Sequence, residues 1–260
     1  MTTLAGLPAW VVVVVSALVC GALAVGFRAL LMRHLGDDRS SAASVAGPLM
    51  PALGAVFALL TATSLAAEAG QYRSAEDNVS AEAAAASRMA WAATSPGLDA
   101  EAIHADLSAY LVSTRTLEWK GGDRDGDPKT MAALGELERT VRAEAAVDGL
   151  GSAQAGELLG SLDSLTSLRR QRLATGANEL PELYLVVVLM SGLALVANSA
   201  ALAITHRARL AALTAGLVVV VALALALLVA ISAPFRGGFV VQGGPVDAVR
   251  TNIDAGDFQP

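Results

Sequence analysis

The sequence predicts an all-α membrane protein with four transmembrane helices and a helical extramembrane domain between the second and third of them. Three observations support this fold class. Hydrophobic residues make up 54% of the 260-residue chain and charged residues only 16%, whereas soluble domains carry about 25% charged residues. The apolar residues gather in four blocks, each close to the ~20 residues that a helix needs to cross a bilayer. Between the second and third blocks lies a polar stretch with apolar residues at helical spacing.

The domain boundaries follow from these changes in composition. We expect the membrane spans at residues 8–33, 45–67, 183–205 and 210–233. Residues 68–182 should form a helical extramembrane domain that is continuous with the second and third spans, and residues 234–260 a polar C-terminal tail. The third and fourth spans should be antiparallel neighbours, since the connection between them is very short.

The second span is predicted to continue beyond the membrane as one long helix. No proline occurs between Pro51 and Pro96, and the polar part after residue 67 keeps strong helix formers. Only Gly70 interrupts it, and one glycine costs a helix roughly 1 kcal/mol, too little to break it where both sides pack. Such a helix suits the lining of a pore better than an active site.

The polar domain is expected to contain three further helices. Apolar residues recur at helical spacing in Asp99–Trp119, in Met131–Ala145 and in Leu158–Leu173. The alternation of apolar and polar residues that is typical of strands is essentially absent. The domain should therefore be a bundle of helices that stands on the membrane.

Several function classes are excluded or disfavoured by the residues present. A formal net charge of −6 excludes nucleic-acid binding based on bulk charge. No nucleophile motif or phosphate-binding loop occurs, and none of the three histidines has a second His or a Cys at metal-ligand spacing. Cys20, the single cysteine, lies within the first span. We therefore expect no enzyme, no cofactor and no metal site.

One face of the second span is the candidate lining of a pore. Phe57, Leu60, Thr61 and Ser64 share a helical face at spacings of three and four residues. The two apolar side chains would form a constriction that closes by dewetting, and the hydroxyls would bind ions weakly beside it. Glu68 lies on about the same face, where a ring of carboxylates would repel anions. It must therefore pair with a base, be protonated or point away from the axis.

Self-association through the same span is a further expectation. Small side chains permit helices to approach closely in lipid, and this span carries a surface of them, at Gly54, Ala55, Ala58, Ala62 and Ala66.

Two sets of polar residues in the domain each have more than one possible role. Glu118 and Trp119 at a helix end favour a structural role. The arginines close to the third span would either attract an anion or a lipid headgroup or form ion pairs with acidic residues of the long helix. These arginines are Arg169, Arg170 and Arg172, and the acidic residues are Glu76, Asp77 and Glu82.

Local signatures along nearly the whole chain match a known family in their order and spacing. They are Gly47-Pro48, residues 54–60, Tyr72, the run from Ala75-Glu76 to Glu82-Ala83, Tyr110, Glu118-Trp119, the run from Arg169 to Arg172-Leu173, Leu180-Pro181 and Pro234-Phe235-Arg236-Gly237. In these the chain resembles the bacterial bestrophin-like family, whose defining region is also known as a domain of unknown function (DUF4239). It departs from the family pattern at Ser232-Ala233, where an acidic and a basic residue are expected.

The resemblance implies a layout and a function. True bestrophins are pentameric anion channels whose second span lines the pore, so the resemblance implies a homo-oligomer in a bacterial inner membrane that passes small anions such as chloride. It also implies a cytoplasmic domain, whereas the arginines of the two short loops favour a domain on the outer side. The acidic calcium clasp of animal bestrophins has no counterpart after Ala233. The alternative function is a non-conducting membrane scaffold or sensor whose helical domain binds a protein partner.

Overall fold

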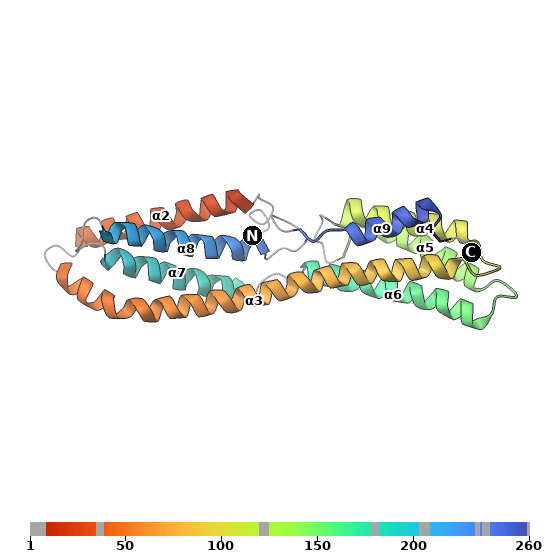
Figure 1. The fold of residues 1–260 in the computed structure, drawn as a ribbon, viewed down its shortest axis with the longest axis horizontal. Helices are drawn as coiled ribbons and strands as arrows, with labels where there is room; N and C mark the ends of the chain where they lie inside the picture. The colour runs from red at the N-terminus through yellow and green to blue at the C-terminus, as the bar shows by residue number, and fades with distance from the viewer. Residues whose placement is uncertain are drawn as a thin grey trace. The chain divides into compact units, whose positions relative to one another are not determined.

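The fold is helical throughout the part of the chain that the structure describes. The computed structural model describes residues 9–34, 39–119, 125–177, 182–202, 209–231, 235 and 240–258, and all regular elements in these ranges are helices (Figure 1). The predicted all-α class is therefore confirmed for these ranges. The chain divides into two compact units, and the long helix α3 (Arg39–Ala93) contributes residues to both.

The first unit is a bundle of apolar helices. It contains α2 (Ala9–His34), α3 up to Gly70, α7 (Glu182–Leu202) and α8 (Arg209–Ile231). Helix α2 packs against both α7 and α8, which also pack against each other. All four helices contain stretches that are long and apolar enough to cross a membrane, at Val13–His34, Ser44–Ala93, Leu183–Leu202 and Thr214–Ile231. The four helices are therefore the candidate spans of a multi-pass membrane protein, in α3 only through the apolar part that belongs to the first unit.

Helix α3 packs against α7 through both polar and apolar contacts. The Asn198 side-chain amide of α7 donates a hydrogen bond to the Ala46 carbonyl oxygen at 2.9 Å. Further along the helix, Phe57 lies against Gly192 of α7, where an added Cβ would be only 3.2 Å from the Phe57 ring. A glycine at this position lets the two helices approach closely.

The long helix continues without a break beyond its apolar part. It has 55 residues and passes through Gly70, whose Cβ position is open. The expected continuity of the domain with the third span concerns residues 178–181, which lie outside the described residues, and it stays a prediction.

The second unit is a helical bundle built on the polar half of α3. It adds α4 (Ala100–Ser113), the π-helix η1 (Thr114–Glu118), α5 (Pro128–Ala145), α6 (Ser152–Ala177) and α9 (Gly244–Ala255). Asp99 and Asp127 cap α4 and α5, since each carboxylate accepts backbone N–H bonds of the first turn. The segment expected as one helix at Asp99–Trp119 thus begins as an α-helix and ends as a π-helix.

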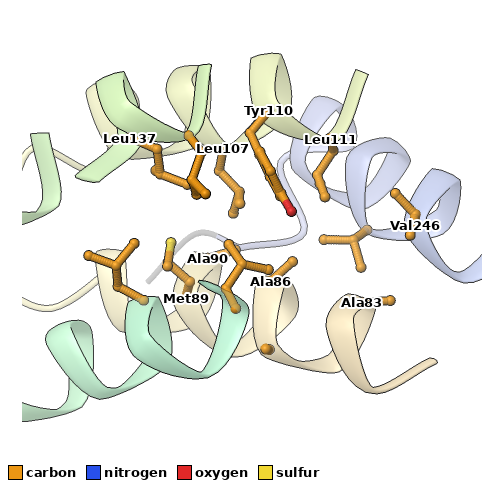
Figure 2. Close-up of a cluster of buried hydrophobic side chains, with 14 of the residues drawn as sticks. Ala83, Ala86, Met89, Ala90, Leu107, Tyr110, Leu111, Leu137 and Val246 are labelled. Atoms are coloured by element: carbon orange, nitrogen blue, oxygen red, sulfur yellow. The ribbon is translucent and has the colours of Figure 1, made fainter. Parts of the chain in front are cut away.

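The core of this unit combines small side chains of α3 with large ones of the other helices. Figure 2 shows Ala86 and Ala90 of α3 opposite Leu107 of α4 and Leu137 of α5. All of these side chains are completely buried or nearly so. Alanines on α3 leave room for the bulky residues of its neighbours, which explains the alanine-rich sequence of this helix.

Residues 240–258 are not part of a polar tail, although the sequence predicted one at residues 234–260. Val241, Val246, Val249 and Phe258 are buried in the core of the second unit, and α9 packs against α4. The sequence does contain a signal for helix α9. Val246, Val249 and Ile253 recur at spacings of three and four residues, with Pro245 in the first turn and Gly256 at the left-handed C-cap. The low average hydrophobicity of the segment concealed this narrow apolar stripe.

Phe258 provides a test of how firmly this C-terminal segment is docked. Its ring is 5% exposed and lies edge-on to Trp91, with the ring centroids 5.6 Å apart. Replacing it with alanine should weaken docking by up to about 3–5 kcal/mol, the usual cost of removing a buried phenylalanine. Hydrogen exchange of the α9 amides in the full-length protein should accelerate in Phe258→Ala and stay unchanged in Val240→Ala, which removes an exposed side chain. Equal protection of α9 in both variants would contradict the docking.

Candidate functional site

Four charged side chains form a buried cluster in the second unit. Glu82 comes from α3, Glu118 from η1, and Arg169 and Arg172 from successive turns of α6. Their relative exposures are 0%, 5%, 5% and 2%, respectively. Burying a charge is costly unless it is paired. Two carboxylates and two guanidinium groups make this cluster neutral as a whole, and we call it the ion network.

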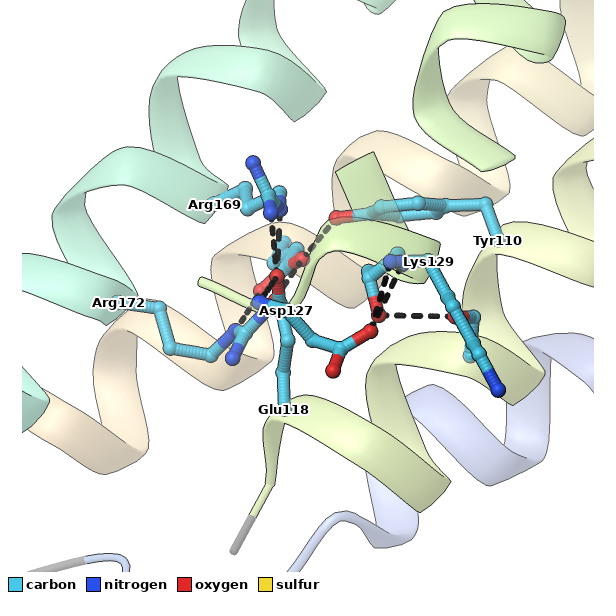
Figure 3. A network of polar contacts seen from close by, with 9 residues as sticks. Tyr110, Glu118, Asp127, Lys129, Arg169 and Arg172 are labelled. Carbon is cyan, nitrogen blue, oxygen red and sulfur yellow. Dashed lines mark hydrogen bonds and ion pairs between the residues drawn. The ribbon is translucent and has the colours of Figure 1, made fainter. Parts of the chain in front are cut away.

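Arg172 links the two carboxylates (Figure 3). Its Nε donates to Glu82 at 2.6 Å, and one of its terminal nitrogens donates to Glu118 at 2.9 Å. Arg169 donates to Glu118 from the other side and forms an ion pair with it. The fixed fork of the guanidinium group suits this kind of bridging, which a lysine cannot reproduce.

Two further groups complete the hydrogen bonding of the carboxylates. The Tyr110 hydroxyl of α4 donates to Glu82 Oε1 at 2.6 Å, and the backbone N–H of Asp127 donates to Glu118 Oε1 at 3.1 Å. Each carboxylate oxygen of the network therefore accepts at least one hydrogen bond. Because Asp127 caps α5, the network joins four helices and η1.

The backbone around Glu118 is shaped to bring its side chain into the cluster. In η1 the Trp119 N–H bonds to the Thr114 carbonyl at 3.0 Å, five residues back, which widens the last turn. Gly126 then passes close to the network with a φ of +73°. A Cβ added there would lie 2.5 Å from Glu118 Oε1 and 2.6 Å from an Arg169 nitrogen, so only glycine fits.

Trp119 connects the network to the C-terminal segment. Its indole N–H donates to the Val241 carbonyl at 3.0 Å, and its ring lies edge-on to Phe235 at a centroid distance of 5.6 Å. The guanidinium of Arg172 lies over the same ring, with its central carbon 5.6 Å from the centroid. On η1, Arg115 forms an ion pair with Asp247 of α9 at 3.1 Å.

The electrostatics of the cluster point to a structural role. Burial lowers the pKa of Arg172, but the charge of Glu82 and the hydrogen bonds to Glu82 and Glu118 outweigh this and leave the pKa raised. Burial, with the charge of Glu82, also raises the pKa of Tyr110 well above its ordinary value, and Arg172 offsets this only in part. In the described part of the chain, no group of three or more His, Cys, Asp or Glu side chains could hold a metal ion.

The structure decides between the two interpretations of the arginines. Arg172 forms the expected ion pair with Glu82, whereas the partner of Arg169 is Glu118, which sequence reasoning had not considered. Arg170 is exposed, as are Glu76 and Asp77. Of the three arginines, only Arg170 thus remains accessible to an anion or a headgroup.

The family-motif positions meet at the network. Glu82, Glu118, Arg169 and Arg172 are its members, Tyr110 donates a hydrogen bond to it, and Trp119 and Phe235 lie beside it. Tyr72 instead packs at the edge of the hydrophobic core. The remaining positions of the motif, Pro181, Pro234 and Gly237, lie outside the described residues.

The predicted pore face of α3 is turned into the protomer. Phe57, Ser64 and Glu68 are only 5%, 4% and 1% exposed, and Leu60 and Thr61 are partly buried. Phe57 and Leu60 pack in the apolar core of the first unit. Helical spacing correctly indicates that these residues share a face, but it does not indicate which face packs inside the protomer. The packing therefore does not support these residues as the lining of a pore around an axis.

The opposite face of α3 is open. Ala55, Ala58, Ala62 and Ala66, four of the five positions of the expected small-residue surface, are exposed, and Gly54 is partly buried. Leu59 is 66% and Val56 50% exposed beside them. The hydroxyl of Thr63, also on this face, bonds to backbone carbonyls of the preceding turn. We call the exposed residues of α3 between Ala52 and Gly70 the open face; none of them is charged.

Tyr110 should make the second unit less stable as the pH becomes alkaline. In the unfolded chain a tyrosine loses its proton near pH ~10, whereas the raised pKa keeps Tyr110 protonated in the folded protein. Its contribution is complete below that pH and is lost as the pH rises toward the folded pKa. The free energy of unfolding should therefore fall more steeply above about pH 10 in the native protein than in Tyr110→Phe. Denaturant titrations at a series of pH values measure both slopes, and parallel curves would contradict the burial of this hydroxyl.

Comparison with known protein families identifies the family of this chain. The model of the bestrophin-like domain matches residues 13–246, which is most of the 260 residues. No curated protein and no solved structure matches the chain. The matched region includes the four long apolar stretches and every residue of the ion network. The chain is a member of the bestrophin-like family of membrane proteins.

Proposed function

We propose that the protein is a homo-oligomeric channel for small anions such as chloride, with the open face of α3 around the conduction path. Its family supports the proposal, since bestrophins are anion channels lined by their second span, and the resemblance favours a pentamer. The proposal includes no enzymatic activity and no cofactor.

The observation that carries the proposal is the composition of the open face. Its small side chains, among them Ala55, Ala62 and Ala66, permit several copies of α3 to approach one axis. Leu59 would then form the narrowest apolar ring, which closes by dewetting, and Thr63 would supply a hydroxyl one turn away. The pore residues of this proposal thus replace the set centred on Phe57.

The inward position of Glu68 also favours anions. A ring of carboxylates on the axis would repel them, but Glu68 is 1% exposed in the protomer and lies off the open face. The open face itself carries no acidic residue, so no negative charge on it opposes the passage of an anion.

Currents through the purified protein in planar bilayers test the proposal with paired variants. Leu59→Ala should raise the single-channel conductance because it widens the apolar ring. Phe57→Ala, the matched control on the packed face, should lower the yield of folded protein without raising the conductance, since it leaves a cavity inside the protomer. Thr63→Asp should shift the reversal potential in a chloride gradient toward that of a cation channel.

Two outcomes would overturn the proposal. A higher conductance in Phe57→Ala but not in Leu59→Ala would return the pore to the face that packs inside the protomer here. The absence of current from well-folded native protein and all three variants would favour the non-conducting scaffold or sensor.

A further inference from the structure

A partly enclosed apolar groove lies between three helices of the first unit. Its volume is about 190 Å³, and it is lined by α2, α7 and α8. The lining includes Val19, Leu23, Leu189, Leu193 and Leu225. The lining on α2 extends from Val15 to Leu23, which corresponds to a length of roughly 12 Å at the rise of an α-helix. The groove is therefore elongated along the helices.

The chemistry of the lining excludes water and charged ligands. Apart from Ser16 and Cys20, all side chains of the lining are aliphatic, and Gly192 contributes backbone. A bound water needs two to four polar partners, and apolar cavities stay dry. The lining also contains no aromatic ring that would stack on a flat ligand. An elongated groove with aliphatic walls fits a flexible hydrocarbon chain.

The position of the groove identifies the source of such a chain. Its three walls belong to the stretches Val13–His34, Leu183–Leu202 and Thr214–Ile231, each long and apolar enough to cross a bilayer. The medium around these helices in a membrane is hydrocarbon. A neighbouring helix, about 10 Å across with its side chains, is too wide to enter the space between adjacent helices. The small-residue surface for helix association lies on α3 and not here.

We propose that the groove between α2, α7 and α8 binds one acyl chain of a membrane phospholipid as a fixed part of the protomer. The chain fills the space that the three helices leave open and joins them by close packing, since an empty groove forfeits these contacts. This lipid site does not depend on whether the protein conducts ions.

A pair of neighbouring tryptophan substitutions tests the site. Val19→Trp fills the groove, whereas Leu18→Trp places the same side chain at an adjacent residue that is 68% exposed and does not line it. Native mass spectrometry of the detergent-washed protein should show a retained phospholipid for each protomer in the native protein and in Leu18→Trp. The occupancy in Val19→Trp should fall at least several-fold. Thermal unfolding verifies that both variants are folded.

Photocrosslinking of the unsubstituted protein tests independently where the acyl chain binds. After the detergent wash, a phosphatidylcholine with a diazirine in its acyl chain should label the residues Val19, Leu189 and Leu225 themselves, as located by sequencing of the labelled peptides. Labelling spread evenly over exposed positions such as Leu18 and Met190 would overturn the proposal. Equal lipid retention in both tryptophan variants, or a native protein that retains no lipid, would also overturn it. So would a Val19→Trp variant that keeps its lipid but no longer forms oligomers.

Discussion

The second unit depends on a neutral set of buried charges that is stable only when it is complete. Glu82, Glu118, Arg169 and Arg172 come from three separate elements, and each leaves water on folding. Burying one ion without its partner is strongly destabilising. The helices must therefore meet in a single register, with η1 widened and a glycine at position 126 to admit the side chains. Glu82, Glu118, Arg169 and Arg172, four of the positions that carry the bestrophin-like resemblance, are thus residues that this register requires. Trp119 extends the constraint to the C-terminal segment, which follows the last apolar helix in the sequence.

The packing of α3 has a corresponding consequence in the first unit. Phe57, Ser64 and Glu68 point toward the protomer's own helices, so the residues left free are small, aliphatic or hydroxylic. A helix with one packed face and one uncharged open face is suited to association around an axis in lipid. The groove on α2, α7 and α8 belongs to other helices of the same bundle. The first unit thus has two distinct surfaces, the open face of α3, which we propose to meet copies of the chain, and the groove, which we propose to hold lipid.

Sequence reasoning predicted the helical class, the four apolar helices and the family, because each leaves a signal that depends on composition or order along the chain. It also predicted the pair of Glu82 and Arg172 as one of two alternatives. It did not find Glu118 as the partner of Arg169, since these residues meet only through tertiary packing. The orientation of α3 could not be inferred either, because both of its faces are nearly uncharged and either satisfies the helical period. Helix α9 was missed because its apolar stripe is narrow, although the spacing of Val246 and Val249 was visible.

A double-mutant cycle on Glu82 and Arg172 tests most directly whether the second unit depends on the complete ion network. Glu82→Gln and Arg172→Gln should each lower the free energy of unfolding by about 3–5 kcal/mol, since each leaves the buried network with one charge that is not neutralised. The double variant should lose clearly less than the sum of the two. Arg170→Gln, which changes an exposed arginine of the same helix, should cost no more than about 0.5 kcal/mol. Additive losses, or a loss for Arg172→Gln no greater than that for Arg170→Gln, would contradict this account.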